Sequence, residues 1–168
     1  MKKGLKEFFK PKRKFMREAI NIAQKDFKKY GEQRIGAVVV KNNKIIAKSG
    51  NKIFRDIDPS SHAEIVAMRI ACKKLKSRDL SDCILYTTNE PCCMCAGAAV
   101  WAKLKGIVYG ANVKDLKDKM KKQGKNFEFF IPCEEVLKKQ KPRTTFLIKD
   151  FMRKECLNSQ KLIEVRKR

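Results

Sequence analysis

The sequence has only one histidine, His62, and no long apolar run. A membrane-spanning helix needs about 20 consecutive apolar residues, so we expect no membrane association. The basic N-terminus precedes neither a sustained apolar segment nor a small-residue cleavage site, which argues against a secretory signal and favours the cytoplasm. The seven cysteines are odd in number and have no framework-like spacing, so a disulfide scaffold is not expected.

The chain also lacks internal repeats and any linker long enough to separate two domains. Its 168 residues, of which 43% are hydrophobic, are enough to build one well-packed core. We therefore predict a single domain over residues 1–168. Within it, residues 1–11 are expected to form a basic arm, and residues 152–168 a basic C-terminal helix.

The charge is strongly one-sided, because 41 lysine and arginine residues face 18 acidic residues and give a net charge of +23. A field of this strength attracts polyanions, and RNA is a natural candidate partner. Lysine carries most of the charge, which also fits an ordinary solvated surface. The charge is therefore consistent both with RNA binding and with a plain solvated surface.

Apolar periodicity and turn residues predict alternating helices and strands. Such alternation favours an α/β fold in which part of the sheet is parallel. The helices are expected at residues 15–30, 62–75, 92–102, 113–123, 133–139 and 151–165. The strands are expected at residues 36–40, 45–47, 83–88, 106–109 and 144–149, the first two joined as a hairpin by Asn42-Asn43.

Four side chains form the most informative pattern in the chain: His62 and Glu64, then Cys92 and Cys95. A Cys-x-x-Cys at a helix start places two sulfurs within one turn, where the helix dipole favours thiolates. An imidazole then completes three protein ligands and leaves a fourth position open, as a catalytic Zn²⁺ site requires. Glu64 is close enough in sequence to move protons beside the metal without binding it.

The cysteine pair fits a structural zinc site or a redox motif less well. A structural zinc site of the Cys₂His₂ type cannot form, because His62 is the only histidine. A redox pair would not require the upstream His-x-Glu. Cys93 lies between the two ligand candidates and is interpreted as a packed or spare thiol.

The arrangement H-x-E followed by P-C-x-x-C is typical of zinc deaminases that act on nucleobases. From Asp58 to Tyr109 the chain resembles the cytidine-deaminase-like superfamily, in its purine-handling branch. The resemblance is carried by residues 58–65 (DPSSHAEI), 84–88 (ILYTT) and 90–98 (EPCCMCAGA). It implies a three-layer α-β-α sandwich around a central mixed five-stranded sheet, and a homodimer.

The resemblance also suggests substrate contacts. It implies that Asn51 hydrogen-bonds the base or its sugar, that the Ala63 backbone N–H contacts the base, and that Trp101 lines the pocket. Two of these residues have a simpler alternative role: Asn51 as a turn residue, and Trp101 as a core or dimer-contact aromatic. Glu90 is expected only to favour the dipole of the following helix.

Two families compete for the substrate. Trp101 and the segments 71–75 and 80–87 resemble guanine deaminases, although the expected Phe-Asp-Asp stretch is absent. The run 95–98 and the strand exit 108–111 resemble tRNA adenosine deaminases, as does the basic C-terminus. We therefore predict deamination of a small-molecule purine such as guanine, with tRNA adenosine as the alternative. A non-catalytic zinc-stabilised nucleic-acid-binding module is a third hypothesis, which an intact Glu64 disfavours.

Overall fold

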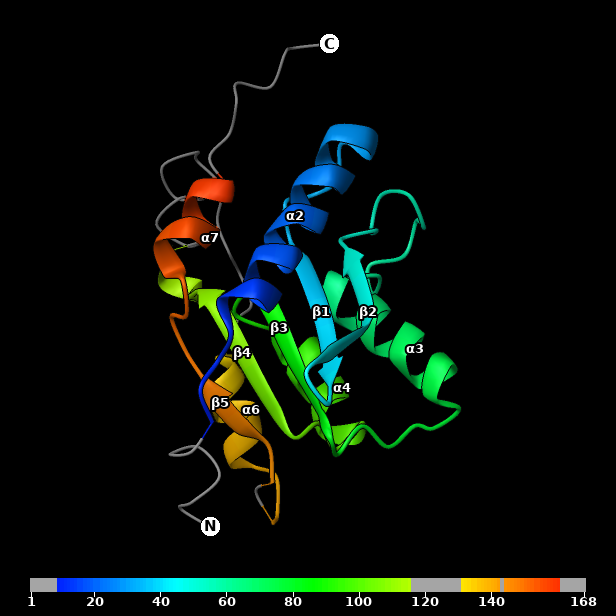
Figure 1. Cartoon of the computed structure of the whole chain (residues 1–168), viewed down its shortest axis with the longest axis vertical. Helices are drawn as coiled ribbons and strands as arrows, with labels where there is room; N and C mark the ends of the chain where they lie inside the picture. Colours follow the sequence, from blue (N-terminus) through cyan, green and yellow to red (C-terminus); the bar gives the residue numbers. More distant parts are fainter. Residues whose placement is uncertain (1–8, 116–130, 143, 161–168) are drawn as a thin grey trace.

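The computed structural model of the chain describes residues 9–115, 131–142 and 144–160. Its sheet has five strands in the order β2-β1-β3-β4-β5 (Figure 1). β1 runs antiparallel to β2 and β3, whereas β3, β4 and β5 are parallel, so the predicted mixed five-stranded sheet is confirmed. The strands are β1 (Gly36–Lys41), β2 (Lys44–Gly50), β3 (Cys83–Asn89), β4 (Gly106–Ala111) and β5 (Phe146–Ile148).

Helices cover both faces of this sheet, which confirms the predicted three layers (Figure 1). One face packs against α2 (Arg13–Tyr30) and α7 (Arg153–Ser159). The other face packs against α3 (Ala63–Leu75), α4 (Cys93–Trp101) and α6 (Cys133–Lys138). None of the described helices is both long and apolar enough to span a membrane.

Alternation along the strands divides the core into two halves. Leu85 and Ile107 are buried on the side of α3 and α4. Their chain neighbours Tyr86 and Val108 are buried on the side of α2 and α7. Because successive strand residues point to opposite faces, nearly continuous apolar strands are the pattern expected of a sheet covered on both sides.

Local signals place the early elements as predicted. Helix α2 ends at Gly31, whose φ of 70° is left-handed and whose N–H donates to the Phe27 carbonyl. Asn42 and Asn43 have φ values of 47° and 60°. Positive φ at both central residues is the geometry of a type I′ hairpin turn, so the hairpin between β1 and β2 is confirmed.

The later elements are shorter than predicted. β5 has three residues, because the N–H groups of Thr144 and Thr145 before it donate to the Gln140 side chain. The Thr145 hydroxyl donates to the Leu104 carbonyl at 2.7 Å. Helix α7 begins only at Arg153, because Asp150 and Met152 both adopt positive φ. The predicted helical residues 116–123 and 161–165 lie outside the described residues, as does most of the basic arm.

The geometry brings several loops to one edge of the sheet. β2, β3 and β4 run in the same direction, so Asn51, Asn89 and Ala111 meet at their carboxyl ends. The loop before α3 and the loop before α4 start from this edge. Ligand sites of open α/β sheets are typically found at such an edge.

Candidate metal centre

His62, Cys92 and Cys95 meet where two helices begin. His62 is the N-cap residue of α3 and Cys92 is the N-cap residue of α4. The His62 Nδ1 lies 3.7 Å from the Cys92 sulfur and 3.5 Å from the Cys95 sulfur, and the two sulfurs are 3.6 Å apart. Within the described ranges this is the group of potential metal ligands whose donor atoms all lie within 4.8 Å of one another.

Hydrogen bonds within this group favour the thiolate form of Cys92. The hydrogen bond between the two sulfurs lowers the pKa of the Cys92 thiol to about 4 and raises the pKa of Cys95. The hydrogen bond to Cys92 raises the pKa of His62. Two sulfurs and one imidazole nitrogen form a donor set that Zn²⁺ prefers. The three residues can therefore supply three protein ligands to a metal ion. Among the described residues, no fourth ligand belongs to this group.

Glu64 lies in the first turn of α3 and is 3% exposed. Its Oε1 accepts a hydrogen bond from the Thr87 hydroxyl at 3.1 Å, whereas its Oε2 has no hydrogen-bond partner among residues 9–115, 131–142 and 144–160. Burial raises the pKa of Glu64, which favours a carboxyl that can both accept and release a proton. The charge of Glu64 in turn contributes to raising the pKa of His62 and of Cys95, so the carboxyl lies beside the ligand group.

Asn51 follows β2 at the same edge of the sheet and is 1% exposed. Its backbone N–H donates to the Ile35 carbonyl at 3.0 Å, but neither the oxygen nor the nitrogen of its side-chain amide has a partner in the part of the chain that the structure describes. Buried amides are normally paired, so two orphaned polar atoms in one side chain are unusual. A bound polar ligand would satisfy both atoms.

The other two predicted substrate contacts, Ala63 and Trp101, lie in different surroundings. Ala63 is the first residue of α3 and is fully buried. Its N–H belongs to the first helical turn, where no intrahelical acceptor exists. Trp101 is the last residue of α4, at the opposite end from Cys92, and its side chain is 87% exposed. Within one chain, Trp101 is therefore not brought together with the ligand group.

Some contacts at this edge are not predictable from the local sequence pattern. That pattern identifies Thr87 only as a strand residue, although a threonine in a fully buried strand is a signal that a polar partner lies nearby. Glu90 does not bond to the start of α4. Its carboxylate accepts hydrogen bonds from the backbone N–H groups of Val113 and Cys133. These partners are 23 and 43 residues away, so no local pattern could reveal them.

Comparison with known proteins gives this geometry a context. Residues 10–154 match the model of the MafB19-like deaminase family. A guanine deaminase from Bacillus subtilis is 43% identical over 101 residues, which cover 60% of this chain and 65% of that protein. A tRNA-specific adenosine deaminase from Aquifex aeolicus is 38% identical over 97 residues, covering 58% of this chain and 64% of that protein. The chain thus spans less than two thirds of the length of these relatives.

Solved structures agree with the fold. A structure from biochemical and structural studies of A-to-I editing by tRNA:A34 deaminases is 27% identical, with a TM-score of 0.67. The match covers 88% of this chain and 99% of that one.

Proposed function

The chain belongs to the MafB19-like deaminase family, and from that premise we propose that it is a zinc-dependent hydrolytic deaminase of a purine base. The observation that carries the proposal is Glu64, a buried carboxyl beside His62, Cys92 and Cys95, one oxygen of which has no partner among the described residues. A protein that used this group only for stability would have no need of an unpaired carboxyl oxygen there. The same feature argues against a non-catalytic nucleic-acid-binding module.

His62, Cys92 and Cys95 would hold the zinc ion. When bound, zinc supplies Lewis acidity that brings the pKa of water from about 15.7 towards about 7. Glu64 is the general acid and base: its free Oε2 takes a proton from the attacking water and delivers it to a ring nitrogen of the base. Glu64 then carries a second proton to the exocyclic amine. The carbon–nitrogen bond breaks, ammonia leaves, and the ring carbon keeps the oxygen as a carbonyl.

Two further groups would orient the base. The unpartnered amide of Asn51 can donate one hydrogen bond and accept another, which suits the edge of a purine. The Ala63 N–H at the start of α3 offers one more donor. Together they would hold the exocyclic amine near Glu64, because a general base needs to be within hydrogen-bond reach of the atoms it serves.

Guanine is the substrate we favour, and adenosine in tRNA is the alternative. The B. subtilis guanine deaminase supports the first, and the A. aeolicus tRNA-specific adenosine deaminase supports the second. The net charge of +23 fits a polyanionic substrate. Both hypotheses use the same ligand group and the same Glu64, and they differ in what surrounds the base.

An ammonia-release assay separates these hypotheses. Zinc-loaded protein is offered guanine, adenine, cytosine, their nucleosides and tRNA, with chelator-treated protein as the control. We expect release from guanine that the chelator abolishes. Release only from tRNA, with affinity that falls steeply as salt rises, would instead support the alternative. Zinc-loaded protein that deaminates none of these would contradict the proposed function.

We also propose that the active protein is a homodimer in the cytoplasm. The feature that supports the dimer is an exposed apolar surface on α3 and α4, where Trp101 is 87% exposed and Met94 is 36% exposed. Together with Met68 and Ala98 they line a groove of about 830 Å³. Exposed apolar surface of this kind is typical of an interface. Sedimentation at micromolar concentration should give a dimer mass, and a monomer would contradict this.

A further inference from the structure

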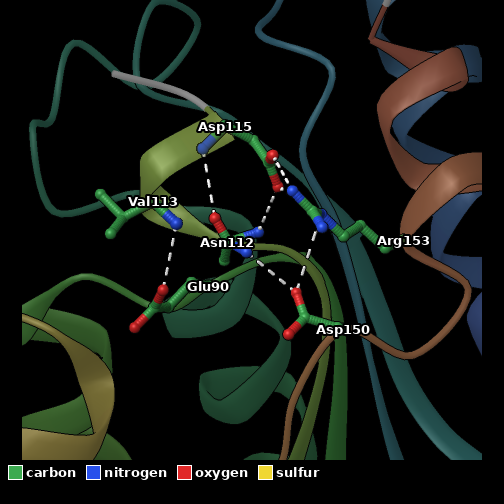
Figure 2. Close-up of polar contacts among 6 residues, drawn as sticks. All are labelled: Glu90, Asn112, Val113, Asp115, Asp150 and Arg153. Atoms are coloured by element: carbon green, nitrogen blue, oxygen red, sulfur yellow. Dashed lines mark hydrogen bonds and ion pairs between the residues drawn. The ribbon is translucent and has the colours of Figure 1, made fainter. Parts of the chain in front are cut away.

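Glu90 occupies an unusual position between the strand that leads to Cys92 and two later segments of the chain. It follows the last residue of β3, and its backbone N–H donates to the Ala111 carbonyl at 2.7 Å. Its side chain is largely buried, with 8% of the residue exposed. Figure 2 shows the Glu90 carboxylate directed toward Val113, in the chain that follows β4.

Both oxygens of Glu90 are used. Oε2 accepts from the Val113 N–H at 3.0 Å, and Oε1 accepts from the Cys133 N–H at 3.1 Å. Each donor opens a helical turn: Val113 begins the turn at residues 113–115, and Cys133 begins α6. N–H groups at helix starts lack intrahelical acceptors and carry partial positive charge, so they stabilise a buried carboxylate. In the described part of the chain no lysine or arginine forms an ion pair with it.

A second set of contacts fixes the far side of Val113. Asn112 and Asp115 bond each other reciprocally, through the Asn112 N–H to the Asp115 carboxylate at 3.1 Å and the Asp115 N–H to the Asn112 side chain at 3.2 Å. Arg153 of α7 donates to Asp115, and the Asn112 amide donates to Asp150 at 3.0 Å (Figure 2). The start of the segment after β4 is therefore tied to α7, and Glu90 ties this assembly to the end of β3, two residues before Cys92.

Cys133, the other partner of Glu90, lies near the ligand group. It is fully buried, and burial raises its pKa to about 12, with the charges of Glu90, Glu64 and Cys92 acting in the same direction. Val113 is also buried, at 8% exposure. Glu90 bonds the backbone of both residues, and Cys133 shares a buried cluster with Cys95.

We propose that Glu90 is a positioning residue for substrate binding: by bonding the Val113 and Cys133 backbones it sets where residues 112–115 and α6 stand against the catalytic centre. The proposal rests on the proposed deaminase function for its kinetic consequence, but not for the contacts themselves. Glu90 takes no part in proton transfer, because both of its oxygens already accept hydrogen bonds. Its loss should weaken binding of the base more than it slows the chemical step.

Glu90→Gln is the sharpest variant, because it keeps the size of the side chain and removes one of the two acceptors. The amide nitrogen would face a backbone N–H, donor against donor. We expect the KM for guanine to rise about tenfold while kcat stays within about threefold, which is the signature of weakened binding. Zinc content should remain that of the wild-type protein. In the zinc-loaded variant, hydrogen exchange at the Val113 and Cys133 amides should accelerate.

Thr145→Val is the matched control. It removes another buried hydrogen bond, from the Thr145 hydroxyl to the Leu104 carbonyl at 2.7 Å, at the opposite edge of the sheet. A general loss of stability would affect both variants alike, whereas a positioning role predicts that only Glu90→Gln raises KM. Equal effects of the two variants on KM would contradict the proposal, as would a fall in kcat with unchanged KM.

The wild-type protein allows a test that does not depend on whether the Glu90→Gln variant folds. Its Val113 and Cys133 amides should exchange as slowly as the central amides of β4 in the zinc-loaded state. Exchange at the rate of an unstructured peptide would overturn the role of Glu90, whatever the enzyme activity. Wild-type protein that releases no ammonia would contradict the proposed function instead, so the two failures can be distinguished.

Discussion

The regions around Glu64 and Glu90 present the same side chain in opposite settings. Each glutamate lies two residues from a ligand candidate, His62 for the first and Cys92 for the second. Each is buried, at 3% and 8% exposure. Within the described ranges, one oxygen of Glu64 has no partner, whereas both oxygens of Glu90 accept backbone N–H groups. A carboxylate with a free oxygen can exchange protons, whereas a saturated one holds structure in place.

The largest effect should come from Glu64→Gln. A glutamine cannot accept the proton of the attacking water, so kcat should fall by about 10²–10⁴-fold, the usual contribution of a general acid and base. The Glu64 carboxyl is not among the three ligand residues, so zinc content should not change. Ammonia release measured at fixed times gives kcat, and metal analysis of the same preparation gives the zinc content.

The same substitution at the other glutamate, Glu90→Gln, gives the variant to compare with Glu64→Gln. If the two glutamates differ as their surroundings indicate, one variant loses kcat and the other raises KM. Substantial turnover by the Glu64 variant would contradict its assignment as general base. A shared kinetic signature in both variants would remove the distinction between a reactive and a saturated carboxylate.

A smaller effect is expected from Asn51→Ala, which extends the comparison from carboxylates to a buried amide. Neither polar atom of the Asn51 side chain has a partner among the residues that the structure describes. Removing a buried unpaired group takes away a desolvation cost, so the melting temperature should not fall. If the amide binds the base, the KM for guanine should rise about tenfold or more, since each hydrogen bond to substrate contributes about 0.5–1.5 kcal/mol.

The opposite result would identify Asn51 as a turn residue. In that case the variant would melt at a lower temperature and bind guanine as well as the wild-type protein does. Thermal denaturation and steady-state kinetics on the same variant separate these outcomes.

Much of the architecture could be predicted from the chain. The strands β1 to β4 and helices α2 to α4 begin and end within a few residues of their predicted bounds, because alternating apolar residues and turn residues act locally. The prediction was least accurate after β4. There β5 is only Phe146–Ile148, since the N–H groups of Thr144 and Thr145 donate to the Gln140 side chain. The positive φ values at Asp150 and Met152 delay α7, and no residue type at those positions announces them.

The sequence by itself determined the ligand candidates His62, Cys92 and Cys95 and the carboxyl of Glu64. Their spacing is local, because His62 and Glu64 lie at the start of α3, and Cys92 and Cys95 lie within one turn at the start of α4. Only the tertiary structure decided that Glu90 bonds Val113 and Cys133, that Asn51 is left without partners, and that Trp101 is exposed. The physical reason is the separation in sequence between the residues that interact. Helix geometry places side chains a few residues apart in a known relation, whereas a hydrogen bond across 43 residues depends on how the whole sheet brings its strand ends together.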